Sequence, residues 1–191
     1  LTPDVDHRRQ YWRAGLLTAA LAFLIIAVAG PRWGFQWEEV RREGVDIVIA
    51  LDTSRSMLAT DVKLSRLERA KLALQELVQQ LQGDRIGLVA FAGSAFIQCP
   101  LTLDYGAFLD SLRATSVGII PKGGTALDEA IRTGLAAFEN HPSKHHALII
   151  ITDGEDHDGQ VQVASQLAAE KGIKVYTIGI GTPEGELIPL T

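Results

Sequence analysis

The feature that most constrains the fold of this chain is a series of short apolar runs separated by amphipathic stretches, from residue 45 onward. Two of the runs are almost entirely aliphatic, as expected for strands covered by helices on both faces of a parallel sheet. Another short run follows the second one closely and predicts an antiparallel edge strand. The sequence therefore predicts an α/β domain with a doubly wound, mostly parallel sheet and helices on both faces. The expected strands are 46–51, 86–91, 95–99 (the edge strand), 147–152 and 174–180.

The stretches between the strands carry the signals that begin and end helices. A side-chain oxygen at the start of a helix accepts a hydrogen bond from a free backbone N–H, and a glycine often ends the helix. Apolar residues recur on one face of each stretch, which predicts helices that pack against the sheet. The predicted helix starts are the capping box of Ser65 with Glu68, the cap Asp104, and the pair Thr125 and Asp128. Gly172 is expected to end the helix predicted over residues 160–171.

Residues 14–30 contain no charged side chain and precede the α/β part of the chain. A helix of that length extends about 25 Å, close to the thickness of the hydrocarbon core of a bilayer. All three tryptophans lie beside this stretch, Trp12 before it and Trp33 and Trp37 after it, as expected for rings at the two membrane interfaces. The sequence therefore predicts a basic flank at 1–13, a transmembrane helix at 14–33, a linker at 34–44 and a domain at 45–191.

Two other interpretations of the apolar stretch remain open. The basic residues before it and Ala27-Val28-Ala29 near its end resemble a signal peptide that is cleaved. The other alternative is a buried helix of a soluble protein, although such a helix usually has a polar face and this one offers only Thr18. The aromatic residues at both ends favour the membrane anchor.

The charges beside the anchor do not decide its orientation, because three arginines precede it and three follow it. The order of a basic segment and then an apolar one favours a cytoplasmic N-terminus. The domain at 45–191 is then expected on the extracytoplasmic side of the membrane. The arginines are Arg8, Arg9 and Arg13 before the stretch and Arg32, Arg41 and Arg42 after it.

Composition excludes several classes of protein. With 191 residues, 47% of them hydrophobic and 21% charged, the chain suits one folded domain and is not of a disordered type. A net charge of -5 argues against a nucleic-acid-binding surface. The single cysteine, Cys99, cannot form an internal disulfide, and we expect it to be a small buried hydrophobic residue.

Polar side chains collect where the predicted strands end. The first strand ends on Asp52, with Ser54 and Ser56 at alternate positions of the turn after it, and Asp153 follows the strand at 147–152. Thr125 stands after two glycines at an expected helix start. The carboxyl ends of parallel strands lie at one edge of a sheet, where ligands bind in such folds. We therefore expect these five side chains to face one site.

All five of these side chains offer oxygen atoms. Hard oxygen ligands select Mg²⁺, with Mn²⁺ or Ca²⁺ as alternatives, over zinc. The competing interpretation is ordinary capping, in which the three hydroxyls only satisfy backbone donors of turns and helix starts. Capping does not account for two strand-end aspartates, because a carboxylate there is costly unless it is solvated, paired or bound to a cation. Three histidines are expected to be ordinary loop residues: His145, His146 and His157.

Residues 52–56, D-T-S-R-S, have the D-x-S-x-S form of the metal-ion-dependent adhesion site (MIDAS) of von Willebrand factor A (VWA) domains. Thr125 and Asp153 fall where that family has its other two motif residues. More closely still, residues 45–191 resemble the bacterial Bat-type aerotolerance proteins. The resemblance implies a Rossmann-like VWA fold, which another strand and a final helix would complete, and relatives with further membrane segments. It is carried by EGVDIVIALDTSRSM, RLERAKLALQELV, GDRIGLVAFAGSAFIQCPLTLD, GGTALDEAI, LIIITDGED and GIKVYTIGIGTPEG.

The resemblance also implies a function and a role for each motif residue. Ser54 and Ser56 would bind the metal directly, Thr125 directly or through water, and Asp52 and Asp153 largely through water. A cation held mainly by hydroxyls stays electrophilic and can accept an Asp or Glu carboxylate of a protein partner. By the same resemblance, the chain belongs to a bacterial inner-membrane complex with other Bat-type proteins and a MoxR-type AAA+ ATPase. The expected role is oxidative-stress tolerance or complex assembly, without catalysis.

The alternative from another class is a Mg²⁺-dependent phosphohydrolase or phospho-acceptor domain on a doubly wound sheet. Such phosphatases need D-x-D at the first strand, whereas Asp52 is followed by Thr53 and Ser54. Phospho-acceptor domains need a lysine at a later strand end, and residues 178–182 read IGIGT. No nucleophile and base are evident as a pair. A third possibility is a structural membrane protein whose site has lost its metal, and only a binding measurement excludes it.

Overall fold

The computed structural model describes residues 7–29, 44–139, 145–154 and 161–182. The chain separates into two compact units, Leu1–Arg41 and Arg42–Thr191. The first unit contains the predicted apolar helix and the second contains the predicted α/β domain. The limits given above for the flank, anchor, linker and domain stay predictions.

Helix α1 (His7–Ala29) is the element of the first unit, and it begins before the stretch that is free of charge. Its Arg8–Val28 portion has a mean hydropathy of 1.8 and is long and apolar enough to cross a membrane. This finding rests on length and composition, which a membrane anchor, a signal sequence and a core helix share, so the three interpretations stay open.

The described part of the second unit is built on a five-stranded sheet with the order β3-β2-β1-β4-β5. The strand β1 is central, and it pairs in parallel with β2 on one side and with β4 on the other. The edge strand β3 runs antiparallel to β2, and β5 runs parallel to β4, so both predictions about the sheet are confirmed. The strands are β1 (Asp46–Asp52), β2 (Arg85–Phe91), β3 (Ala95–Thr102), β4 (His146–Thr152) and β5 (Lys174–Gly179).

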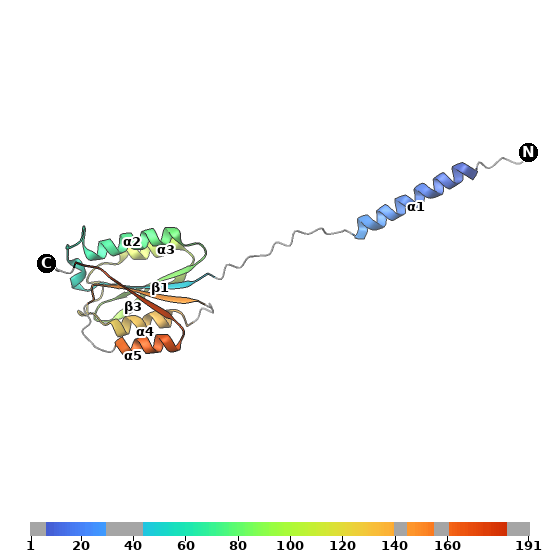
Figure 1. Cartoon of the computed structure of the whole chain (residues 1–191). Coiled ribbons are helices and arrows are strands. Elements are labelled where there is room, and N and C mark those ends of the chain that lie inside the picture. Colours follow the sequence, from blue (N-terminus) through green and yellow to red (C-terminus); the bar gives the residue numbers. More distant parts are fainter. Residues whose placement is uncertain (1–6, 30–43, 140–144, 155–160, 183–191) are drawn as a thin grey trace, which may run out of the picture. The chain divides into compact units, whose positions relative to one another are not determined.

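Helices cover both faces of this sheet, as predicted (Figure 1). On one face lie α2 (Arg66–Gln80) and α3 (Tyr105–Ala114), and on the other lie α4 (Leu127–Ala137) and α5 (Val161–Glu170). Two of the predicted helix starts are confirmed by their hydrogen bonds. The Ser65 side chain accepts from Glu68 N at 3.3 Å, and the Asp104 side chain accepts from Ala107 N at 3.1 Å.

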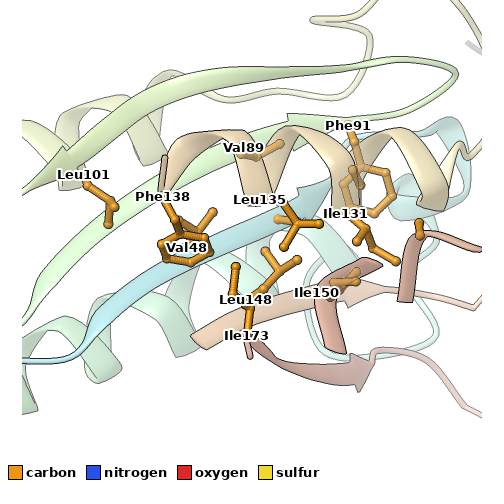
Figure 2. Close-up of a cluster of buried hydrophobic side chains, with 14 residues drawn as sticks. Val48, Val89, Phe91, Leu101, Ile131, Leu135, Phe138, Leu148, Ile150 and Ile173 are labelled. Carbon is orange, nitrogen blue, oxygen red and sulfur yellow. The ribbon is translucent and has the colours of Figure 1, made fainter. Parts of the chain in front are cut away.

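The aliphatic character of β1 follows from its place between two cores. Val48 points into the cluster under α4 and α5, beside Leu135 and Leu148 (Figure 2). Ala50 belongs to the same cluster. The intervening residues Ile49 and Leu51 belong to the cluster under α2 and α3. Because successive side chains of a strand alternate between faces, a strand that is buried on both faces has to be apolar at every position.

The strand order places the end of β1 at the point where the chain changes direction in the sheet. From β1 the chain passes to β2 on one side and later to β4 on the other. Between two such strands the loops diverge and leave a crevice beyond the carboxyl ends of the strands. The residues that follow β1, β2 and β4 therefore share one edge of the sheet.

Candidate metal centre

Asp52 is the last residue of β1, and it is completely buried. Its Oδ1 accepts a hydrogen bond of 2.8 Å from Ser54 N, and its Oδ2 accepts one of 2.7 Å from Thr152 Oγ1. Burial raises the pKa of Asp52 above its ordinary value of 3.8, an effect that outweighs the lowering by the hydrogen bonds from Ser54 and Thr152. The structure therefore keeps a carboxylate in a place that favours its neutral form, unless a cation compensates the charge.

Ser54 and Ser56 lie side by side in the turn after β1. Their Oγ atoms are 2.9 Å apart and hydrogen-bonded, and both residues are buried. Ser54 precedes the short 3-10 helix η1 (Arg55–Leu58), but its side chain makes no capping hydrogen bond there. The capping interpretation therefore fails for Ser54, and two hydroxyl oxygens remain directed at one another beside Asp52.

Thr125 lies in the loop before α4 and is buried, with 3% of its surface exposed. The prediction that Thr125 opens α4 is wrong, because Ala126 occupies the N-cap position and no side chain caps this helix. The loop turns next to the end of β2 instead, where Ala126 N donates to Ala92 O at 2.7 Å and Gly93 N donates to Lys122 O at 3.1 Å. Within the described ranges, no hydrogen bond joins the Thr125 side chain to the two serines or the two aspartates.

Asp153 follows the end of β4, and only 2% of its side chain is exposed. Its Oδ2 accepts a hydrogen bond of 2.8 Å from Arg66 Nη1. Its Oδ1 is buried and has no hydrogen-bond partner among the described residues. The negative charge of Asp153 also contributes to the raised pKa of Asp52, which places the two carboxylates close enough to repel one another. A buried carboxylate oxygen without a partner is what a missing cation or its water would leave behind.

Two residues of this site were not found from the sequence. Thr152 binds Asp52, and Arg66 binds both Asp153 and Asp61, with Nε and Nη2 donating to the two Asp61 oxygens at 2.9 and 2.8 Å. This pairing holds the pKa of Asp61 well below its usual range. Arg66 and Asp153 are 87 residues apart, so no local pattern announces their contact. Thr152 could have been suspected from the sequence, because it directly precedes the motif residue Asp153.

The donor chemistry of the site fits a hard divalent cation. The candidate ligands are hydroxyl and carboxylate oxygens that are gathered at one edge of the sheet, with an unpartnered oxygen on Asp153. In the part of the chain that the structure describes, no group of three or more His, Cys, Asp or Glu residues could hold a metal. A metal here would therefore depend on the hydroxyls of Ser54 and Ser56.

The other residues considered in the sequence lie elsewhere. The His146 ring stacks on Phe138 with centroids 4.7 Å apart, and its Nε2 lies 3.5 Å from Asp46 Oδ2, at the opposite end of β4 from Asp153. Cys99 is buried, and burial raises the pKa of its thiol, so it is packed as predicted. His157 lies outside the described residues.

Comparison with known proteins identifies the fold. The family model of the von Willebrand factor type A domain matches residues 47–155. The crystal structure of a conserved hypothetical protein BatB from Bacteroides thetaiotaomicron is 47% identical, with a TM-score of 0.73 over 77% of this chain and 72% of that one. An aerotolerance-related membrane protein from Bacteroides fragilis, solved with multiple mutations to serine, is 41% identical, with a TM-score of 0.74 over 77% and 73%.

More distant relatives extend these findings. A UPF0353 protein of Nocardia farcinica is 36% identical over 90% of this chain and 55% of its own length. The chain thus spans little more than half the length of the curated relatives that it matches. Proximal thread matrix protein 1 of the mussel byssus shares the fold, with a TM-score of 0.60 and 23% identity over 73% of this chain and 36% of its own, and its MIDAS motif has been observed with zinc.

These matches and the strand order of the sheet identify the same fold. The family model covers β1 through β4, and the two Bat-like structures cover the described domain at high identity. Von Willebrand factor type A domains are in general interaction modules that bind other proteins. The chain therefore belongs to the von Willebrand factor type A domain family, among the Bat-like aerotolerance membrane proteins.

Proposed function

We propose that this domain is a non-enzymatic, metal-dependent protein-binding module. The observation that carries the proposal is the buried cluster of oxygen donors at the end of β1. Asp52 is fully buried, the Ser54 and Ser56 hydroxyls lie 2.9 Å apart beside it, and Asp153 Oδ1 has no hydrogen-bond partner in the described part of the chain. Burying this many polar atoms at a strand edge is costly without a bound ligand.

The five motif residues would hold the metal in the roles that their surroundings support. Ser54 and Ser56 would bind it directly, and Thr125 would bind directly or through water. Asp52 and Asp153 would act largely through water, because both carboxylates already accept hydrogen bonds from Ser54 N, Thr152 and Arg66. We expect Mg²⁺, with Mn²⁺ or Ca²⁺ able to use the same oxygen ligands. The metal supplies positive charge that a partner carboxylate can bind.

A phosphohydrolase or phospho-acceptor role has less support from the geometry. A phospho-acceptor aspartate needs a carboxylate oxygen that can reach the phosphorus atom. Asp52 has no exposed surface, and both of its oxygens accept hydrogen bonds. An interaction role needs no such access, since the partner would contact the metal rather than Asp52.

The cellular setting is proposed from the anchor and the relatives. α1 would hold the domain at a bacterial inner membrane, and the order of basic and then apolar residues favours an extracytoplasmic, periplasmic domain. The partner would offer an Asp or Glu side chain. By family resemblance, other Bat-type membrane proteins and a MoxR-type AAA+ ATPase system belong to the same assembly, which would serve oxidative-stress tolerance or complex assembly.

The test is whether the protein binds a carboxylate only when a metal is present. The full chain in detergent micelles would be titrated with an end-blocked peptide that has a single aspartate, in Mg²⁺ and in EDTA, and followed by the amide NMR signals of residues 52–56. We expect saturable shifts in Mg²⁺ that disappear in EDTA, in the Ser54→Ala variant, and with the Asn form of the peptide. Shifts that survive the chelator or the change to Asn would contradict the proposal.

A further inference from the structure

A cavity of about 520 Å³ lies directly beside the candidate metal centre. Its walls come from the turn after β1, the end of β2 and the loop before α4, and they include Thr53, Ser54, Ala92 and Ile120. Ser54 therefore belongs both to the proposed metal ligands and to the cavity wall. A ligand that reaches the metal at Ser54 would have this space next to it, and the volume suits a side chain or a short segment.

Among the described residues that line this cavity, two are charged and both are positive: Arg55 and Lys122. Arg55 is exposed between the two serines, and Lys122 is exposed in the loop before α4. Neither forms an ion pair with any residue in the described ranges, although the whole chain has a net charge of -5. Within the described residues, no carboxylate therefore neutralises these two cations, and a negatively charged ligand would complement them.

Two apolar residues also line the cavity. Ile120 is only 7% exposed, and Pro121 lies beside it in the cavity wall. A ligand that fits must therefore combine a short aliphatic part with a terminal negative charge. Aspartate and glutamate side chains have this composition, and a guanidinium and an ammonium group would both bind their carboxylate.

We infer that the partner binds through two acidic residues, one at the metal and one in this cavity between Arg55 and Lys122. The inference rests on the proposed function, because the first carboxylate is the one that the metal binds. The occupant is a short segment of a partner protein with two carboxylates close together in sequence. Such a two-point contact would distinguish the right partner from the many proteins that expose a single acidic side chain.

The experiment compares two dye-labelled, end-blocked tripeptides by fluorescence anisotropy on the full chain in detergent micelles with Mg²⁺. One is Asp-Gly-Glu and the other is Asp-Gly-Gln, so they differ in the second carboxylate alone. We expect the diacidic peptide to bind at least about fivefold more tightly, since charge-assisted contacts across a cleft discriminate between ligands in this way. Both peptides should lose binding in EDTA.

Substitutions locate the preference within the cavity. Lys122→Gln and Arg55→Gln should each reduce the ratio of the two affinities toward one, while binding of the monoacidic peptide persists. Lys174→Gln is the matched control, because it also removes one positive charge. Lys174 is exposed at the start of β5, at the opposite end of the parallel strands from the cavity. This variant should keep the full preference.

The outcomes separate the inference from the proposed function. If both peptides bind equally and in a Mg²⁺-dependent manner, the module stands and the second carboxylate site is wrong. A preference that survives in both cavity variants, or that persists in EDTA, also overturns the inference. If neither peptide binds with Mg²⁺, the carboxylate-binding function and the inference fail together.

Discussion

At the scale of single residues, the informative group is the carboxyl of Asp52. It is fully buried at the end of β1, and burial raises its pKa although Ser54 and Thr152 donate hydrogen bonds to it. A group of this kind reduces stability when it is ionised without a counter-charge. Its presence at a central strand end therefore indicates that function, rather than stability, determines the residue.

We predict that Asp52→Asn leaves the metal-free protein as stable as the wild type, or more stable, at neutral pH. Folded Asp52 retains its proton at pH values where the unfolded chain has lost it, so the contribution of Asp52 to stability falls as pH rises from the ordinary pKa of 3.8 through the raised pKa of the folded state. The asparagine variant has no such dependence. The measurement is urea unfolding in EDTA, from acid to neutral pH.

The same variant should gain nothing from Mg²⁺. Wild-type stability should increase with Mg²⁺ concentration, as for any ligand that binds the folded state alone. A wild type that is clearly more stable than Asp52→Asn in EDTA at neutral pH would show that the buried carboxylate stabilises the fold without metal.

At the scale of elements, Arg66 connects three parts of the domain that are distant in sequence. It starts α2, binds Asp153 after β4, and forms a two-pronged contact with Asp61. Asp61 in turn accepts hydrogen bonds from the backbone N–H and the hydroxyl of Thr182, beyond β5. The position of Asp153 thus depends on a side chain from another element.

We predict that Arg66→Lys lowers the free energy of unfolding by about 2 kcal/mol, since lysine cannot reproduce the planar fork and charge-assisted hydrogen bonds are lost. Only 11% of the Arg66 side chain is exposed, so solvent offers little replacement. Urea unfolding in EDTA at neutral pH measures the effect. Arg69→Lys, on the exposed side of the same helix, is the control, and equal effects of the two changes would contradict the assignment.

The loop with Thr125 depends on the absence of a side chain at Gly93. A Cβ atom on Gly93 would lie 2.1 Å from Gly123 O, so the two loops could not approach as closely as they do. We predict that Gly93→Ala displaces Thr125 and weakens Mg²⁺ binding by at least about tenfold, because a binding site tolerates only small displacements of its ligands. Calorimetry on this variant and on Gly179→Ala, where the added atom meets nothing within 4 Å, provides the comparison. Unchanged binding in Gly93→Ala would remove Thr125 from the site.

At the scale of the whole molecule, the proposal that α1 anchors the domain in a membrane can be tested directly. We predict that the full chain floats with lipid vesicles and that Leu21→Arg greatly reduces this association. A charged residue near the middle of a membrane-spanning helix costs about 3 kcal/mol. Leu21→Ala is the control and should still float. Equal flotation of the arginine variant would show that the helix does not cross the bilayer.

The sequence predicted the fold better than it predicted the contacts within the site. The strands were found because β1 and β4 are buried on both faces and therefore aliphatic at almost every position. Asp52, Ser54 and Ser56 could be proposed together because they stand at alternate positions of one short segment, and their role in metal binding stays a prediction. The prediction that Thr125 caps a helix was wrong, because the hydrogen bond from Ala126 N to Ala92 O fixes the loop and the helix begins one residue later than the sequence indicates. The role of Arg66 depends on a fold-level contact across 87 residues, which no local pattern encodes.

The measurement that tests the central claim most directly is calorimetric titration of the full chain in detergent micelles with Mg²⁺. It would compare the wild type with Ser54→Ala and Ser56→Ala, and with Ser165→Ala as a control, because Ser165 is exposed on α5 and its hydroxyl donates to Val161 O of the same helix. The account predicts one saturable site in the wild type and in Ser165→Ala, and loss of binding in the other two variants. Equal Mg²⁺ binding in all four proteins, or none in the wild type, would contradict it.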